Sequence, residues 1–123
     1  MRNGTVHSYS RARAIRDGVL VDVTETAREA GLGYPTAITA SVWADCVRVP
    51  EGVEGQDEAG RLWDILWMCR CGILHSREVE AELLFQLHVR NDNRRATLVT
   101  LKAVCGPGDE LEPVITIMFP DED

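Results

Sequence analysis

The hydrophobic period of the sequence changes near its middle, and this change constrains the fold more than any other feature. Leu83, Phe85, Leu87 and Val89 alternate with more polar residues, which predicts a strand with one apolar face. Before this segment, apolar residues recur mostly at helical spacing. Helices followed by antiparallel strands are typical of an α+β domain.

The second half of the chain is expected to form most of the sheet. Alternation over residues 98–105 and 114–119 predicts two more strands, and Gly106-Pro107-Gly108-Asp109 between them fits a type II turn. Residues 19–23 also alternate and predict an additional edge strand. We therefore expect a three- to four-stranded antiparallel sheet with the helices packed on one face.

The first third of the chain contains signals for two short helices. Ser8 or Ser10 can cap a helix that runs to about residue 17. Thr26 and Glu29 have the spacing of a capping box, although Thr24 could equally be the cap of the second helix.

A third helix is predicted over Thr36–Val47. Ile38, Val42 and Cys46 recur every four residues in this range, which is the spacing of one face of an amphipathic helix. Pro50 is expected to end it.

The longest helix is predicted to begin at Gln56 or Asp57 and to be apolar around nearly its whole circumference. Residues 62–74 contain only two charged side chains, so this helix is expected to be covered on several sides, in the core or in a dimer. Trp63 and Trp67 are one turn apart and are expected to stack.

Composition indicates one globular domain, residues 1–123, with 45% apolar and 27% charged residues. The formal net charge of -7 argues against direct nucleic-acid binding, which depends on clustered Lys and Arg, and favours a basic partner. The first 18 residues have no apolar core of a signal peptide, and the longest apolar run, Ile65–Cys69, is far shorter than the ~20 residues of a membrane span. A cytoplasmic protein without a membrane segment is therefore expected.

The four cysteines suggest a metal site or an enzyme as an alternative. Cys71 and His75 lie one helical turn apart and could share a zinc ion with Cys69, Cys46 or Cys105. Cys69 and Cys71 would point about 200° apart around a helix, however, which makes a shared ion difficult. We predict buried free thiols, no catalytic residue and no cofactor.

Carboxylates provide the positive argument for a function. If residues 78–82 are extended, the three glutamates among them share a face at about 6.8 Å spacing, which is comparable to neighbouring phosphates on a nucleic-acid strand. A helix here would instead spread them around its axis, and they would then be solubilising surface. The predicted protein-binding residues are Asp57, Glu58, Glu78, Glu80, Glu82, Asp109 and Glu110.

Several longer segments point to a family. The stretches YSRA (residues 9–12), GVLVDVTETA (18–27), DEAGRLWD (57–64), GPGD (106–109) and EPVITIM (112–118) resemble those of a family of small bacterial proteins of unknown function. Members of that family tend to be carried by plasmids, conjugative elements and phages. The resemblance therefore implies mobile-element biology, and it supplies no catalytic residues.

The leading hypothesis is a small non-catalytic protein that binds another protein through an acidic surface. Its partner would be a basic, nucleic-acid-binding defence complex, so that the protein would act as an anti-CRISPR or anti-restriction inhibitor. One alternative is a small enzyme or metal-binding protein that uses Cys71 and His75. Another is a structural homodimer in which the central helix packs against its twin.

Overall fold

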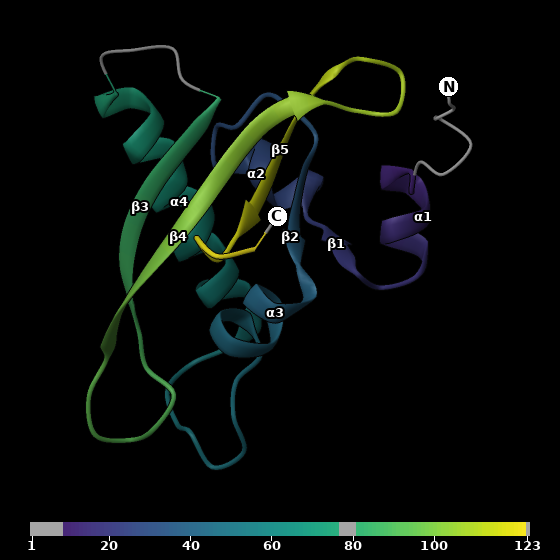
Figure 1. Ribbon diagram of the computed structural model, residues 1–123. Helices are drawn as coiled ribbons and strands as arrows, with labels where there is room; N and C mark the ends of the chain where they lie inside the picture. The colour runs from purple at the N-terminus through teal and green to yellow at the C-terminus, as the bar shows by residue number, and fades with distance from the viewer. Residues whose placement is uncertain (1–8, 77–80, 123) are drawn as a thin grey trace.

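The computed structural model describes residues 9–76 and 81–122, which form one sheet with helices around it (Figure 1). In chain order the elements are α1 (Arg11–Arg16), β1 (Leu20–Asp22), α2 (Thr24–Glu29), β2 (Thr36–Thr39), α3 (Ala40–Val42), the π-helical turn η2 (Trp43–Val47), α4 (Glu58–His75), β3 (Glu82–Val89), β4 (Thr97–Pro107) and β5 (Pro113–Met118).

The sheet has five strands in the order β1-β2-β5-β4-β3. Strands β2 and β5 are parallel, and the other neighbours are antiparallel. The α+β class is confirmed, but the expected three to four antiparallel strands are replaced by a five-stranded mixed sheet. The difference comes from β2, which the sequence pattern assigned to a helix.

Residues Thr36–Thr39 are a strand, so the helix predicted over Thr36–Val47 is wrong in its first third. Helical structure starts only at Ala40, where the Thr39 hydroxyl accepts a hydrogen bond from the backbone of Val42 at 3.3 Å. Thr36, Ala37 and Ile38 are all fully buried because β2 lies inside the sheet. A strand covered on both faces does not alternate, and a short apolar stretch then cannot be distinguished from a helix by period.

The caps of the short helices were predicted in part. Ser10 caps α1, and its side chain accepts a hydrogen bond from the first helical turn. The capping box of Thr26 and Glu29 is wrong, because α2 already begins at Thr24 and no side chain caps it. The Thr24 hydroxyl binds the backbone of Thr36 instead, so it joins α2 to β2.

The last hairpin turns later than the type II turn predicted at Gly106–Asp109. Gly106 and Pro107 still pair with β5, and the chain reverses only over residues 108–112. There the amide of Leu111 donates to the Gly108 carbonyl at 3.0 Å. The predicted type II turn would have placed Gly108 in the left-handed conformation. Leu111 takes that conformation instead, with φ of 66°.

Helices α2 and α4 cover one face of the sheet, and together they enclose the core (Figure 1). Ile65 and Leu66 of α4 pack there with Ile38, Leu101 and Ile117 of the strands, and all five are fully buried. Helix α1 lies apart from α2 and α4 at the β1 end of the sheet (Figure 1). Within the described ranges no helix has both the length and the apolarity needed to cross a bilayer.

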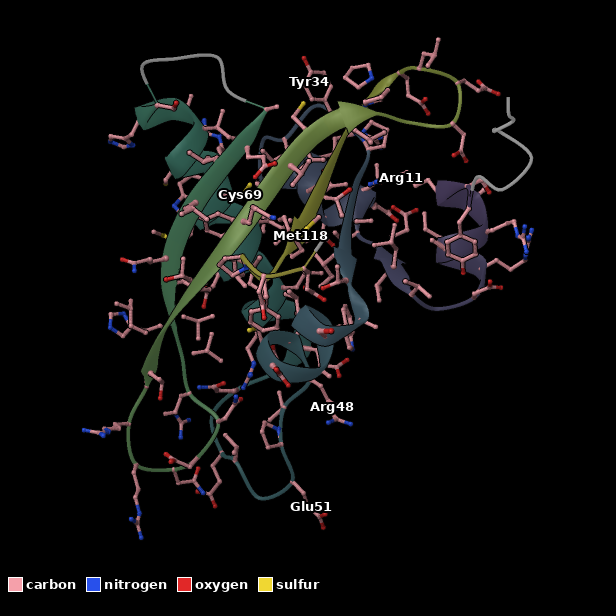
Figure 2. The ribbon with its side chains drawn as sticks, viewed as in Figure 1. Arg11, Tyr34, Arg48, Glu51, Cys69 and Met118 are labelled. Atoms are coloured by element: carbon pink, nitrogen blue, oxygen red, sulfur yellow. The ribbon has the colours of Figure 1, made fainter. Side chains whose placement is uncertain are left out.

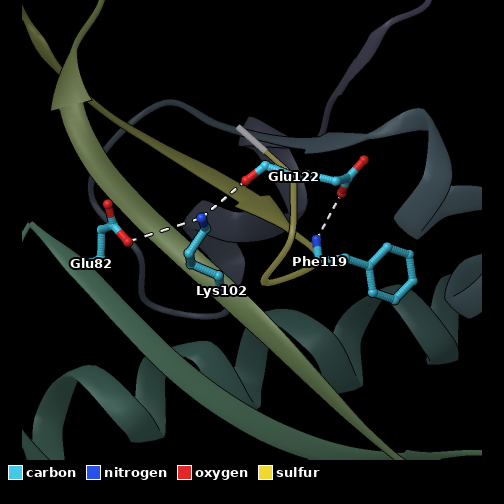
Figure 3. A network of polar contacts seen from close by, with 4 residues as sticks. All are labelled: Glu82, Lys102, Phe119 and Glu122. Carbon is cyan, nitrogen blue, oxygen red and sulfur yellow. Dashed lines mark hydrogen bonds and ion pairs between the residues drawn. The ribbon is translucent and has the colours of Figure 1, made fainter.

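The C-terminal turn is fastened to the other face of the sheet (Figure 3). Lys102 of β4 donates to the backbone carbonyl of Glu122 at 3.0 Å, and its Nζ lies 3.9 Å from a carboxylate oxygen of Glu82. The Glu122 carboxylate accepts a hydrogen bond from the Phe119 amide at 2.7 Å. No helix of the described residues covers this face over β3 and β4.

Candidate interaction surface

Helix α4 begins where the sequence indicated. Asp57 is its N-cap, and a carboxylate oxygen of Asp57 accepts a hydrogen bond from the Gly60 amide at 2.6 Å. The negative charge of Asp57 and of Glu58 in the first turn suits the positive end of the helix dipole. The helix then runs to His75 without interruption.

A buried arginine anchors the N-terminal half of α4. Arg61 is only 7% exposed, and its guanidinium donates to the carbonyls of Cys46 and Arg90 at 2.9 Å each and to the side chains of Gln56 at 2.9 Å and Asn91 at 2.6 Å. Arg61 therefore joins α4 to η2 and to the end of β3. The sequence contains no local signal for this role, because its acceptors come from three separate segments.

Only one side of α4 is covered, contrary to the expectation that this helix is enclosed on several sides. The buried side consists of Arg61, Leu62, Ile65, Leu66 and Cys69. On the outer side Trp63 is 38%, Trp67 42% and Leu74 63% exposed. The sheet, α2 and η2 are the elements that pack on α4, and they leave its outer surface in contact with solvent.

We call Trp63, Trp67 and Leu74 the tryptophan face. The two indole rings stack as predicted, with centroids 6.0 Å apart and planes inclined by 14°. The guanidinium of Arg70 lies 5.0 Å from the Trp67 ring centroid, and the Arg70 side chain runs so close to Gly31 that a Cβ there would lie 2.6 Å from its Nε. Trp67 therefore lies on the side of α4 toward α2, and Arg70 holds its ring in place.

The acidic residues predicted to bind a partner do not form one surface within the described residues. Asp57 and Glu58 start α4 just after the loop of residues 48–56, which forms the lower end of the molecule and carries Glu51 (Figure 2). Asp109 and Glu110 lie in the turn between β4 and β5 at the upper end (Figure 1).

The remaining predicted carboxylates differ in their surroundings. Glu82 begins β3 and forms the ion pair with Lys102. Asp109 accepts hydrogen bonds from the backbone amides of Arg11 at 2.8 Å and Ala12 at 3.0 Å, and these bonds lower the pKa of Asp109. Asp109 is exposed, but its carboxylate is already bound to the first turn of α1. Glu78 and Glu80 lie outside the described residues.

A cleft of about 470 Å³ connects the acidic start of α4 with the tryptophan face. Asp57, Asp64 and Trp63 line it on the α4 side, and Leu87 and His88 line it on the β3 side. Two arginines, Arg61 and Arg90, also line it. Carboxylates, guanidinium groups and an exposed indole therefore adjoin at this end of the helix.

Cys46 and Cys69 are buried as predicted, but Cys71 is half-buried and Cys105 is exposed, so the prediction of buried thiols is wrong for Cys105. Desolvation raises the pKa of Cys46 to about 11 and that of Cys69 to about 12, so both are protonated thiols near neutral pH. His75 contacts the backbone carbonyl of Cys71 through Nδ1 at 2.7 Å. Among the described residues no group of three His, Cys, Asp or Glu side chains is placed to hold a metal ion.

A wider groove of about 1260 Å³ lies between α1, the β4–β5 turn and the C-terminal turn. Its polar groups bind one another: Arg11 extends from α1 toward β5 (Figure 2) and donates to the Thr116 hydroxyl at 2.7 Å, and the Thr39 hydroxyl donates to the Glu122 carboxylate at 2.9 Å. Since these contacts hold the fold together, the exposed side of α4 is the better candidate for binding a partner.

The fold and this surface define an α+β protein whose most distinctive exposed feature is an aromatic helix face. A family model matches residues 2–123, and the chain belongs to this family of unknown function, DUF6573. Neither the curated proteins nor the solved structures include a match to the chain.

Proposed function

We propose that this protein is a non-catalytic binding protein of mobile-element origin that inhibits a basic, nucleic-acid-binding defence complex of the CRISPR or restriction type. The observation that carries the proposal is the tryptophan face of α4, which adjoins carboxylates at the start of the same helix. The mobile-element origin is supported by the resemblance described above.

The tryptophan face supports protein binding because exposed indoles at this density are unusual on a solvated surface. Trp63 and Trp67 are stacked in advance, and Arg70 holds Trp67, so little side-chain entropy is lost when a partner covers them. Tryptophan is enriched among the residues that dominate binding energy at protein interfaces. The affinity is therefore assigned to this face.

The charge supports a basic partner. The formal net charge of -7 speeds the encounter with a positively charged surface and makes the association rate sensitive to salt. Asp57, Glu58 and Asp64 lie in the first two turns of the helix that bears Trp63 and are assigned to the interface. The carboxylates of the β4–β5 turn contribute to the overall field but not to this interface.

The test starts from capture of host proteins by the tagged protein at low salt, followed by identification of the captured species by mass spectrometry. Recombinant partner is then titrated calorimetrically with the wild type, with Trp67→Ala and with the double variant Glu58→Lys/Asp64→Lys. We expect Trp67→Ala to weaken binding by about 30-fold or more. The charge reversal should slow association and reduce its dependence on salt.

Two matched controls test the location of the interface. Leu98→Ala removes an exposed apolar side chain that is 52% exposed on β4, and Glu110→Lys reverses a charge in the β4–β5 turn. Both should bind as the wild type does. Unchanged affinity of Trp67→Ala, or a captured partner without nucleic-acid-binding activity, would contradict the proposal.

A further inference from the structure

Strand β3 has an open edge. It pairs with β4 over its whole length, from Glu82 opposite Val104 to Val89 opposite Thr97. On its other side no strand of residues 9–76 or 81–122 pairs with it. Eight residues of extended backbone therefore end the sheet with outward N–H and C=O groups that have no ladder partner.

The two edge strands of the sheet, β1 and β3, differ in length and in how well they are covered. At the other end β1 is only three residues long, and α1 packs beside it, so that edge is short and shielded. In β3 the one-to-one register with β4 leaves no room for a bulge, and the strand contains no Pro or Lys, with Glu82 at its start as its only carboxylate. Bulges, Pro and Lys are among the devices by which proteins prevent an edge from pairing with another strand, and without them β3 is open to pairing.

We propose that β3 pairs antiparallel with β3 of a second copy of this chain, which gives a two-fold dimer with a continuous ten-stranded sheet. Residues directly opposite one another in antiparallel strands point to the same face. A two-fold axis perpendicular to the sheet at Gln86, in the middle of the strand, places residues that point to the same face opposite one another. Gln86 of each copy then faces Gln86 of the other, and both sets of helices lie on the same side.

The charges on β3 suit this register. With the axis at Gln86, Glu82 lies opposite Arg90 of the second copy at both ends of the paired strands. Arg90 forms no ion pair with a carboxylate of the described residues, since its guanidinium donates to the carbonyls of Asp92 and Glu54. Each copy thus places the Glu82 carboxylate, which also lies 3.9 Å from Lys102, opposite an arginine that has no ion pair within residues 9–76 and 81–122.

The exposed apolar side chain of β3 is also covered. Leu84 is 61% exposed on the face of the sheet that no helix of the described residues covers. In the proposed register Leu84 lies opposite His88 of the second copy, so that the added strand covers one side of the Leu84 side chain. Pairing therefore buries surface that the single chain leaves in water.

Helix α4 fits the same axis. A Cβ at Gly72 would lie 3.1 Å from Leu83 and 3.5 Å from Phe85, so Met68, one turn earlier, lies beside the middle of β3. Met68 is 36% exposed, and the two-fold brings it toward Met68 of the second copy. The two helices then run antiparallel with opposed dipoles. Trp67, on the side toward α2, stays outside this contact, whereas the cleft that Trp63 lines with Leu87 and His88 lies beside it.

Sedimentation velocity from 0.5 to 100 µM tests the dimer, with Gln86→Lys as the disrupting variant. We expect the wild type to sediment as a dimer at the upper concentrations. Gln86→Lys places two like charges opposite each other at the axis and should raise the dimer dissociation constant about tenfold. Thr100→Lys is the control, because Thr100 of β4 accepts the hydrogen bond of Gln86 and the variant adds the same charge next to it. In the dimer the two Thr100 residues are three strand spacings apart, roughly 14 Å. Thr100→Lys should therefore dimerise as the wild type does.

Circular dichroism first establishes that both variants are folded. A wild type that is monomeric throughout this range would overturn the dimer, as would equal effects of Gln86→Lys and Thr100→Lys. Loss of the dimer in Trp67→Ala with its retention in Gln86→Lys would instead place self-association on the tryptophan face and overturn the β3 contact. The proposed function is tested separately, because partner binding by Trp67→Ala is measured whatever the oligomeric state.

Discussion

Arg61 shows how much of this protein depends on a single buried side chain. Its guanidinium serves acceptors from η2, the loop before α4 and the segment after β3, and none of these acceptors is a carboxylate. The attraction therefore comes from ion–dipole hydrogen bonds, which keep a buried charge satisfied without a second charge.

Replacing Arg61 is expected to destabilise the fold strongly. Arg61→Met leaves buried carbonyls without donors and should lower the free energy of unfolding by about 3 kcal/mol. Arg61→Lys should lose less, because an ammonium supplies donors but not the planar fork. Urea unfolding measures both. The exposed Arg94 provides the control, since Arg94→Met should change stability by less than about 0.5 kcal/mol; equal losses at both positions would contradict the role of Arg61.

The cysteines should differ sharply in reactivity. In the native protein at pH 8, the exposed Cys105 should react with a disulfide reagent at least about tenfold faster than Cys46 or Cys69. The pKa values of the two buried thiols, about 11 and about 12, exceed the ordinary 9.0. The native state therefore holds protons that the unfolded state has lost, and stability should fall as pH rises above about 9. Equal labelling of all sites by mass spectrometry would contradict this assignment.

At the scale of elements, α4 has two sides with different roles, and stability measurements should separate them. Ile65→Ala empties a fully buried site and should cost about 3 to 4 kcal/mol. Trp67→Ala removes a larger side chain that is 42% exposed, and it should cost only about 1 kcal/mol. Thermal unfolding of the two variants provides the comparison, and a larger loss for Trp67→Ala would show that the tryptophan face is structural.

The whole molecule is closed by contacts between its first helix and its last hairpin. Asp109 caps α1 across 98 positions of sequence, through the Arg11 amide, and the Arg11 side chain reaches the Ile115 carbonyl at 2.8 Å. A residue chosen from the sequence as a binding carboxylate thus also joins α1 to the β4–β5 turn.

Asp109→Ala should release α1 and lower the melting temperature by a few degrees, whereas Glu110→Ala should leave it unchanged. The hydrogen bonds from Arg11 and Ala12 lower the pKa of Asp109, so its contribution is present above the unfolded pKa near 3.8 and is lost as pH falls below it. The difference between Asp109→Ala and the wild type should therefore shrink below about pH 4. Faster hydrogen exchange confined to α1 would confirm the release, and a difference that does not shrink as the pH falls would contradict it.

Prediction from the sequence succeeded where the signal is local. The cap at Ser10, the start of α4 at Asp57 and the alternation of β3 all depend on residues within a few positions of one another. It failed at β2, whose pairing with β5 joins segments almost 80 positions apart in the chain. It also failed to place the acidic residues relative to one another, because their positions depend on how the hairpin and α4 are oriented.

The sequence by itself determined the class of the fold, most element boundaries and the stacked tryptophans, because caps, periods and one-turn spacings act over short distances. Only the tertiary structure decided that β2 enters the sheet, that α4 exposes its tryptophan face and that β3 ends the sheet with an open edge. Burial on both faces hides a strand's alternation, and exposure is a property of what packs nearby. Neither is encoded in the neighbours of a residue along the chain.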